Sequence, residues 1–280
     1  MKVQTLIEKY GANDQRTEAW HAKRGEMLTA SEIYKATKDA TPAARHELIM
    51  SKLVPRPKFD GPGPKALVWG TRFEPIAKEI YCSLQGGIQI VDTTCIPHPV
   101  HSFLGASPDG IIVTKDPEDF RYGKLVEFKC PISREFNDTT PIPPAYYAQM
   151  QLQMECTELY DCEYIEMGFK DLSYSEWCDT PAEYKSFFAV SDDESNVIYK
   201  DFRDPRDVIT WKNEVLGEKA ETYYMIYWIL KKKRSTTVAK DTTWLSSNLE
   251  SFKAVWDEIQ IHRAAGTLPT SPKEKATLTL

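Results

Sequence analysis

The sequence predicts an α/β protein of the α+β kind, with both helices and β-strands. Three observations support this fold class. Apolar residues recur at helical spacing in 66–87, residues alternate and are often β-branched in 88–130, and a helical pattern in 145–156 precedes a strand-like run in 162–170. With 41% hydrophobic and 27% charged residues over 280 positions, the composition is that of a globular protein able to bury a sizeable core.

The net charge of −6 means that an overall basic surface, a common sign of nucleic-acid binding, is absent. A nucleic-acid site would need local basic residues or bound metal ions to offset its carboxylates. The amino terminus lacks the apolar run of a signal peptide, and no apolar stretch approaches the roughly 18–20 residues of a membrane span. We therefore expect an intracellular protein without a membrane segment, whose six cysteines are reduced thiols.

Near the amino terminus, residues 1–20 are expected to be a weakly ordered lead-in followed by a helix start. Thr29 and Glu32 have the spacing of a capping box, which predicts a helix from Thr29. The free amides of its first turn, with Ser31 and the upstream Arg24, could hold a phosphate. The alternative is a plain capped helix with a solvent-facing arginine, and the spacing alone favours this alternative.

Two further helices are expected in the first third of the chain, in 46–54 and in 66–87, where Gly86 and Gly87 end the second one. The proline- and glycine-rich run 55–65 between them predicts a loop.

Glu74 is expected in the first turn of the second helix. It could cap that turn together with Thr71, or it could supply a carboxylate to a site elsewhere.

The middle of the chain is expected to be a strand meander in 88–130, a loop in 131–144 and a helix in 145–156. Gln149 and Gln153 share one face of that helix. Amide side chains on a helix usually lie at the surface, so a surface position without a functional role is an alternative for both glutamines.

Beyond the strand in 162–170, residues 186–190 and 196–202 predict a hairpin, and the remainder reads as helical, first in 205–234. A last helix is expected to begin at the capping box Ser247/Glu250 and to end at Gly266, with an apolar stripe suited to the core or to a subunit interface.

The basic run Lys231–Arg234 could be a nuclear-import signal or a phosphate contact. Alternatively, its charges could complement the carboxyl end of the helix expected there, and this alternative is favoured.

The most informative stretch runs from Gly105 to Lys129 and holds an aspartate, Asp109, in a turn between two strand-like runs. Glu127 and Lys129 lie two positions apart in the second run, so their side chains project from the same face of the strand. Charged groups within an apolar strand are costly to bury without partners. This cost makes the stretch a candidate site.

The chemistry of these three residues suits phosphodiester hydrolysis. Mg²⁺ prefers hard oxygen ligands, of which Asp109 and Glu127 supply two, and Lys129 could orient or deprotonate the attacking water or balance phosphate charge. The alternative is a strand-surface ion pair of small energetic value. Cys95, His98 and His101 have a spacing that could ligate zinc, but no fourth ligand nearby completes a tetrahedral set.

Five segments stand in order along residues 19–151: AWHAKRGEMLTASE (19–32), KALVWGTRFEPIA (65–77), GASPDGI (105–111), LVEFKCP (125–131) and AYYAQMQ (145–151). Read together, they resemble the lambda-exonuclease-like (YqaJ-type) viral recombination nucleases of the PD-(D/E)xK superfamily. The resemblance fades after about residue 170. It implies a restriction-endonuclease-like core with a central mixed sheet in residues 1–204, and we expect residues 205–280 to be a helical extension packed on that core within one structural domain.

The resemblance also implies roles for individual residues. Asp109 and Glu127 match the metal-binding acids, with the backbone carbonyl of Phe128 as a further ligand, and Lys129 matches the catalytic lysine. The remaining matches are Glu74 as an acid acting through water, Gln149 near the active site, Gln151 as a weaker neighbour that contacts DNA, and Arg24 with Ser31 as the grip on a 5′-phosphate. This last match favours the phosphate reading over the plain capped helix.

The implied activity is that of a Mg²⁺- or Mn²⁺-dependent deoxyribonuclease with two ions per site. Such an enzyme would degrade linear double-stranded DNA from 5′ to 3′ and leave 3′ single-stranded tails for viral recombination, repair or genome processing. An endonuclease or RNase of the same fold and a non-catalytic nucleic-acid-binding partner remain alternatives. The implied partners are double-stranded DNA with free ends and a single-strand-annealing protein. The chain would act as a trimer or as a monomer, in the cytoplasm or nucleus of an infected cell.

Overall fold

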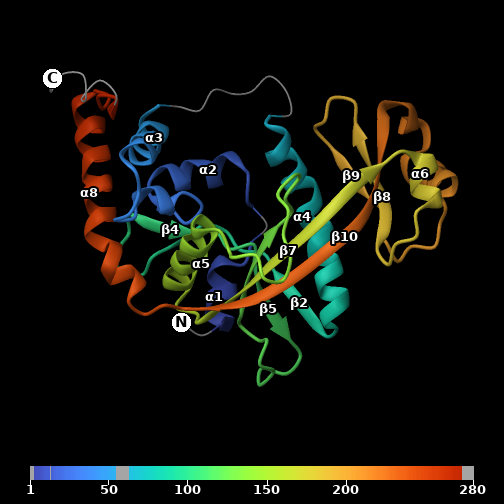
Figure 1. The fold of residues 1–280 in the computed structure, drawn as a ribbon, viewed down its shortest axis with the longest axis horizontal. Coiled ribbons are helices and arrows are strands. Elements are labelled where there is room, and N and C mark those ends of the chain that lie inside the picture. The colour runs from blue at the N-terminus through green and yellow to red at the C-terminus, as the bar shows by residue number, and fades with distance from the viewer. Residues whose placement is uncertain (1–2, 13, 55–62, 273–280) are drawn as a thin grey trace.

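The structure, a computed structural model, describes residues 3–12, 14–54 and 63–272. It contains a seven-stranded mixed sheet and a smaller three-stranded sheet, with helices packed around both (Figure 1). The α+β fold class expected from the sequence is confirmed, including a central mixed sheet flanked by helices. Residues 55–62, most of the expected loop, lie outside the described residues.

The main sheet has the order β2-β5-β6-β7-β10-β8-β9. Its strands are β2 (Ile88–Val91), β5 (Gly110–Thr114), β6 (Leu125–Lys129), β7 (Asp161–Leu172), β8 (Lys185–Ser191), β9 (Val197–Tyr199) and β10 (Tyr223–Ala239). Within this sheet β6 and β7 pair in parallel and the other neighbours pair antiparallel. A parallel pair needs a crossover connection, which the helix α5 (Pro144–Thr157) supplies.

Two helices cover opposite faces of this sheet. The helix α4 (Lys65–Gln85) buries the apolar stripe that its sequence predicts, and it ends at Gly86, whose φ of 57° favours glycine. The α4 stripe packs on the face that carries Val126 and Phe128. The helix α5, together with α1 (Val3–Tyr10), packs on the face that carries Leu125. Because strand side chains alternate, Glu127 and Lys129 lie on the α5 side of β6.

A second layer lies beside α5 and contains the small sheet, β1 (Leu28–Thr29), β4 (Leu104–Ala106) and β3 (Ile96–Pro97), in the order β1-β4-β3. The helices α3 (Pro42–Leu53), α8 (Trp244–Ala265) and the 3₁₀ turn η1 (Ile33–Ala36) share one apolar cluster with it. The short helix α2 (Glu18–Gly25) leads into this layer. In Figure 1, α8 forms the edge of the molecule opposite to β8 and β9.

The other end of the molecule is built around β8 and β9. Four short elements lie near these two strands: the helices α6 (Tyr174–Asp179) and α7 (Val208–Trp211), the π turn η2 (Lys212–Leu216) and the 3₁₀ turn η3 (Gly217–Thr222). An aromatic-rich cluster that includes Phe187 and Trp211 holds these elements together. The long strands β7 and β10 connect this end to the middle of the sheet (Figure 1).

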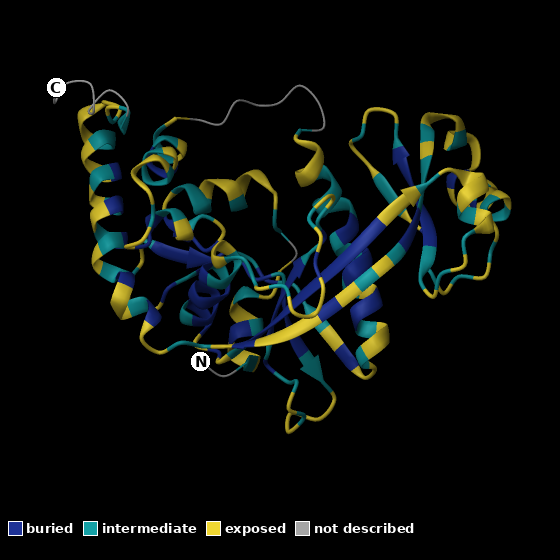
Figure 2. Ribbon diagram, in the orientation of Figure 1, coloured by how far each residue is buried: buried dark blue, intermediate teal, exposed yellow. Residues whose placement is uncertain are grey.

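The prediction that residues 205–234 are helical is wrong over its second half. Residues 223–239 form β10, which pairs with β7 on one side and with β8 on the other. The apolar run Tyr223–Leu230 fits either element by length, and its aromatic residues suit a strand that is paired on both sides. Most of β7 is buried, whereas exposure alternates along much of β10 (Figure 2). The extension after residue 204 is therefore helical only in part, and the division of the chain at that residue stays a prediction.

Two predicted helix starts and the predicted place of Glu74 in its helix also differ from the structure. No α-helix begins at Thr29, which lies in β1 and is followed by the four-residue turn η1. One half of the predicted capping box nevertheless forms, because the Thr29 amide donates to Glu32 Oε1 at 2.9 Å. The helix α8 begins at Trp244, three residues before Ser247. Glu74 lies in the middle of α4, so the expected capping of a first turn is wrong.

All six cysteines are unpaired, as expected, and Cys178 is the exposed one. In the described part of the chain, no helix combines the length and apolar character needed to cross a membrane.

Candidate active site

The candidate site is centred on the turn before β5 and on the adjacent strand β6. Asp109 immediately precedes β5, and its Oδ2 accepts a hydrogen bond of 2.7 Å from the Phe128 amide. Gly110 allows the chain to come close to β2, since a Cβ there would lie 2.3 Å from Ile90 Cγ2. The Asp-Gly pair of the sequence therefore fixes the carboxylate against β6.

The carboxylate of Glu127 is fully buried and is contacted on both oxygens. Lys129 Nζ forms an ion pair with Oε1, and Gln153 Nε2 donates to Oε2 at 2.6 Å. Lys129 Nζ also lies 3.4 Å from Gln149 Oε1 and 4.6 Å from the centre of the Tyr146 ring. The α5 helix thus supplies one wall of the site.

Glu74 enters the site from α4. Its Oε2 accepts from Arg16 Nη2 at 2.8 Å, and its Oε1 lies 3.4 Å from Lys78 Nζ. A cavity of about 500 Å³ connects Glu74 and Arg16 with Lys129 and Tyr146. The structure therefore brings together Asp109, Glu127, Lys129, Glu74 and Gln149, as the sequence predicts.

The charges of this cluster shift each other's proton affinities. Removal from water raises the pKa of Asp109 well above its ordinary value, and the nearby carboxylates of Glu127 and Glu74 raise it further. Burial alone would lower the pKa of Lys129, but the attraction of Glu127 and Asp109 more than offsets this effect, so the pKa is raised. The ammonium of Lys129 is consequently held in its charged form.

The oxygen groups at this site fit a divalent cation. Among residues 3–12, 14–54 and 63–272, no three His, Cys, Asp or Glu side chains form a ready ligand set. Mg²⁺ usually needs only one or two protein carboxylates, because waters and substrate phosphates supply its other ligands. Asp109 lies near the carboxylates of Glu127 and Glu74, and a cation would offset the repulsion among these three groups. Asp109 and Glu127 are the residues that would hold it.

The two residues assigned to a 5′-phosphate also meet. Arg24 Nη2 donates to Ser31 Oγ at 2.6 Å and to Thr29 Oγ1 at 3.1 Å. Arg24 stacks on Trp20, whose indole nitrogen donates to Ser107 Oγ at 3.1 Å. Ser107 belongs to the same turn as Asp109, which links this pair to the candidate site. The sequence also predicts that backbone amides of a helical first turn bind this phosphate, but no α-helix begins at Thr29.

Gln151 does not lie at the site. Its side chain is fully buried, its Nε2 donates to Ala239 O at 3.0 Å, and its Oε1 accepts from Asp241 N at 2.8 Å. Residues two positions apart in a helix are rotated by about 200°, so Gln151 points away from the side of α5 that carries Gln149 and Gln153. The expected contact of Gln151 with DNA is therefore corrected to a structural role that joins α5 to the end of β10.

Four contributors were missed at the sequence level. Gln153 shares a helical face with Gln149, and that spacing was the available signal. Tyr146 precedes Gln149 by three residues, and Ser107 lies in the motif of Asp109, so both could have been found from the motifs. For Arg16, the sequence offers no comparable signal.

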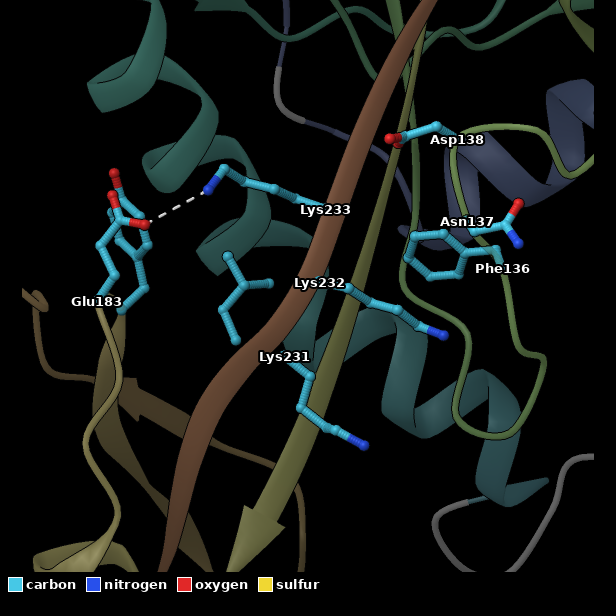
Figure 3. A pocket seen from close by; sticks show the side chains of 9 residues that line it. Phe136, Asn137, Asp138, Glu183, Lys231, Lys232 and Lys233 are labelled. Carbon is cyan, nitrogen blue, oxygen red and sulfur yellow. Dashed lines mark ion pairs between the residues drawn. The ribbon is translucent and has the colours of Figure 1, made fainter.

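The basic run Lys231–Arg234 lies in β10, so its predicted place at a helix carboxyl end is wrong. It borders a cavity of about 600 Å³ whose walls include Phe136, Asp138 and Tyr184 (Figure 3). Lys233 reaches toward Glu183, with 3.5 Å between Nζ and Oε2, and Lys232 pairs with Glu135. Carboxylates therefore offset the charges of Lys232 and Lys233 at this cavity. Roles in nuclear import or phosphate contact stay predictions.

The residues considered for zinc have other partners. His98 Nδ1 accepts hydrogen bonds from the amides of Val100 and His101 at 3.1 and 3.0 Å, and the buried thiol of Cys95 contacts Met27 Sδ at 3.6 Å. Burial, followed by the neighbouring His101, lowers the pKa of His98 to about 4. A neutral imidazole therefore stabilises this turn.

Comparison with known proteins finds a family model that covers half of the chain. The family model described as "YqaJ-like viral recombinase domain" matches residues 19–160. The uncharacterized protein R354 of Acanthamoeba polyphaga mimivirus is 28% identical over 184 residues, which are 62% of this chain and 32% of that protein. This chain thus spans about a third of the length of that relative.

Two solved structures share the fold. The alkaline exonuclease LHK-Exo from Laribacter hongkongensis superposes with a TM-score of 0.53 and 20% identity, covering 94% of this chain and all of that one. Its complex with dAMP gives a TM-score of 0.51 and 21% identity, covering 89% and 98%. At these identities the likeness concerns the fold, which is that of an alkaline exonuclease.

Proposed function

We propose that this chain, which belongs to the family of YqaJ-like viral recombinase domains, is a metal-dependent nuclease that hydrolyses DNA. The observation that carries the proposal is the meeting of Asp109, Glu127 and Lys129 on neighbouring strands, beside a cavity that Glu74 also lines. A surface ion pair, the alternative left open by the sequence, does not describe Glu127, because its carboxylate is fully buried.

The proposed cofactor is Mg²⁺ or Mn²⁺, with two ions per site. The ions would be held by Asp109, Glu127 and the backbone carbonyl of Phe128. Glu74 would contact them through water. When bound, such ions supply an activated water and stabilise negative charge on the phosphoryl oxygens.

The side chains of the protein have distinct parts in this proposal. Lys129 would balance charge on the phosphate that is attacked, since Glu127 and Asp109 raise its pKa and keep it protonated. Gln153 fixes the orientation of Glu127, and Gln149 and Tyr146 confine the Lys129 ammonium. These contacts keep the acid and the ammonium in place before substrate arrives.

We further propose 5′-to-3′ digestion of linear double-stranded DNA that leaves 3′ single-stranded tails for recombination, repair or genome processing. The pair Arg24–Ser31 would hold the terminal 5′-phosphate, because an arginine and a hydroxyl 2.6 Å apart present several donors to one anion. Ser107 joins this pair to the turn of Asp109 and so relates the held end to the acids. A single-strand-annealing partner, and assembly as a trimer or monomer, stay predictions.

The deciding experiment compares digestion of linear and covalently closed duplex DNA with Mg²⁺, with Mn²⁺ and with EDTA. We expect metal-dependent loss of the linear form alone, and Asp109→Ala and Lys129→Ala should abolish it in folded protein. Digestion of the closed circle or of an RNA substrate would favour an endonuclease or RNase instead. Binding without turnover under every condition would favour a non-catalytic recombination partner and contradict the proposal.

A further inference from the structure

The segment between α1 and α2 is attached to the turn that carries the catalytic aspartate, although it precedes the family match at residue 19. The Thr94 amide donates to Tyr10 O at 2.9 Å, and Thr94 Oγ1 donates to Asp14 Oδ2 at 2.8 Å. Gly11 forms a bridge with Thr93. These contacts hold the segment against residues 93–94.

Gln15 extends this attachment to the site itself. Its Nε2 donates to Thr93 O at 2.9 Å and to Pro108 O at 3.0 Å, and Thr93 Oγ1 donates to the same Pro108 oxygen at 3.0 Å. Pro108 directly precedes Asp109. The position of residue 16 is therefore fixed relative to the candidate metal-binding acid.

Arg16 has a φ of 73°, in the left-handed region that favours glycine. In a residue other than glycine, this backbone conformation commonly destabilises the fold by more free energy than a half-exposed ion pair contributes. The side chain of Arg16 is 50% exposed, so its pair with Glu74 is of that modest kind. Stability alone does not account for an arginine at this position.

The guanidinium of Arg16 lines the same cavity as Lys129. Its hydrogen bond among the described residues uses Nη2, which leaves other N–H groups of the planar fork for an anion. Arginine matches the geometry of a phosphate well, because two parallel N–H groups can bind two of its oxygens.

We propose that Arg16 binds a phosphate of the DNA strand that enters the catalytic cavity. Because Arg16 also pairs with Glu74, it would connect this phosphate to the Glu74 carboxylate. This inference rests on the proposed nuclease function. The contact lies on the α4 side of the cavity, whereas Lys129 approaches from β6. Arg16 is thus a substrate-contacting residue delivered by a segment outside the matched domain.

The test measures binding of a 5′-phosphorylated duplex by fluorescence anisotropy across a range of salt concentrations, with Ca²⁺ replacing Mg²⁺ and intact DNA verified on gels. Arg16→Gly removes the guanidinium and suits the left-handed backbone, whereas Arg16→Lys retains the charge. Arg203→Gln is the matched control, since Arg203 is 53% exposed and pairs at 2.7 Å with Glu79 of α4, the helix that also carries Glu74.

We expect Arg16→Gly to weaken binding by about tenfold and to reduce the slope of log Kd against log salt by about 0.9, the value of one duplex phosphate contact. Its melting temperature should equal or exceed that of the wild type, which separates the effect from misfolding. Arg16→Lys should retain the salt slope, and Arg203→Gln should change neither affinity nor slope.

Unchanged affinity and slope in Arg16→Gly, with normal binding by the wild type, would overturn the inference and leave the proposed function intact. An unchanged slope combined with weaker Mn²⁺ binding would also overturn it, because Arg16 would then act only on Glu74. If the wild type itself binds no DNA, the proposed function fails as well.

Discussion

Gln153, fully buried on α5, donates a hydrogen bond of 2.6 Å from Nε2 to Oε2 of Glu127. The other oxygen of that carboxylate pairs with Lys129, so the orientation of Glu127 is set from both sides. Groups that orient a metal ligand without touching the metal typically change affinity or activity by 10–100-fold when they are removed.

Gln153→Ala should therefore lower kcat/KM by roughly 10–100-fold, since Glu127 loses a buried donor. Gln151→Ala is the control, because Gln151 is equally buried on the same helix but bonds to residues 239 and 241. Gln153→Ala should cost about 1–3 kcal/mol of folding stability, because it leaves the buried Glu127 carboxylate without a donor. Gln151→Ala should also lower stability, because it removes two hydrogen bonds of a buried side chain. Steady-state kinetics on folded protein separates them, and equal activities in the two variants would contradict a role for Gln153.

Asp109→Asn should raise the melting temperature of the metal-free protein at pH 7. Burial and the nearby acids raise the pKa of Asp109, so its ionised form is less favourable in the folded state than in the unfolded state. The cost is absent below the ordinary pKa near 3.8, develops as pH rises toward the folded value, and is full above that value. Asparagine removes this charge and can still accept from the Phe128 amide.

Scanning fluorimetry with and without Mn²⁺ checks this prediction. For each kcal/mol gained, the midpoint should rise by about 2–4 °C. Added Mn²⁺ should stabilise the wild type but not Asp109→Asn, because a ligand stabilises only the state that binds it. Asp119→Asn should instead lower the midpoint, since the hydrogen bonds of Arg121 lower the pKa of Asp119 to about 2 and so favour its ionised form. A lower midpoint for metal-free Asp109→Asn would refute the prediction.

The rate of hydrolysis should show no rise from pH 7 to pH 9 that depends on Lys129. Burial opposes the charge, but Glu127 and Asp109 raise the pKa of Lys129 and keep the ammonium protonated across this range. Single-turnover rates of the wild type and of Lys129→Arg should therefore run parallel with pH, while the rate of Lys129→Ala should fall by at least roughly 10²–10³-fold, to the limit of detection. A rise of tenfold per pH unit that vanishes in Lys129→Arg would show that Lys129 acts as a base.

Acid should destabilise the protein through His98 between about pH 6.5 and pH 4. Burial and His101 lower the pKa of His98 to about 4, so within this window the unfolded state binds a proton that the folded state does not. Stability is lost as pH falls through the window, by up to about 3 kcal/mol at pH 4. The charged ring could not accept the amides of Val100 and His101 at Nδ1.

Urea unfolding of wild type and His98→Asn at pH 7 and pH 4.5 measures this contribution. The variant should lose less stability on acidification. His262→Asn, a change at a partly exposed histidine on α8, should behave like the wild type. If His98→Asn and the wild type lose the same stability, the assignment to His98 is wrong.

The pair Arg24–Ser31 should distinguish DNA ends. The wild type should digest 5′-phosphoryl duplex faster than 5′-hydroxyl duplex, and Arg24→Gln should reduce this preference by about tenfold or more, as a charge-assisted contact is lost. Arg45→Gln is a suitable control, since Arg45 contacts the backbone of Ser251 in the layer of α8. Indifference of the wild type to the end group would remove the role assigned to both residues.

Local patterns were sufficient to predict much of the site. Alternation along β6 placed Glu127 and Lys129 on one face, and the Asp-Gly turn placed Asp109 beside them. The apolar stripe and Gly86 gave the span of α4 almost to the residue. In each of these cases, the spacing of neighbouring residues determines the geometry.

Features set by distant contacts could not be predicted in the same way. The run that forms β10 is a strand because β7 and β8 pair with it on both sides, and both strands are distant in the sequence. Helical spacing separates Gln151 from Gln149 and Gln153, but only the packing of α5 decides which of these two sides meets the acids. Arg16 reaches Glu74 through a left-handed turn that residue types alone do not indicate.

The central place of β10 has a consequence for the order in which the protein can be built during synthesis. Strand β8 pairs with β10, and β10 in turn pairs along the length of β7, so the strands beyond β7 have no backbone pairing with the rest of the sheet until residues 223–239 have left the ribosome. Such long-range pairing is slow and leaves the edge of β7 open to other chains meanwhile. A nascent chain stalled near residue 204 should therefore bind chaperones and resist protease poorly, whereas one extended past α8 should become protected in a single step.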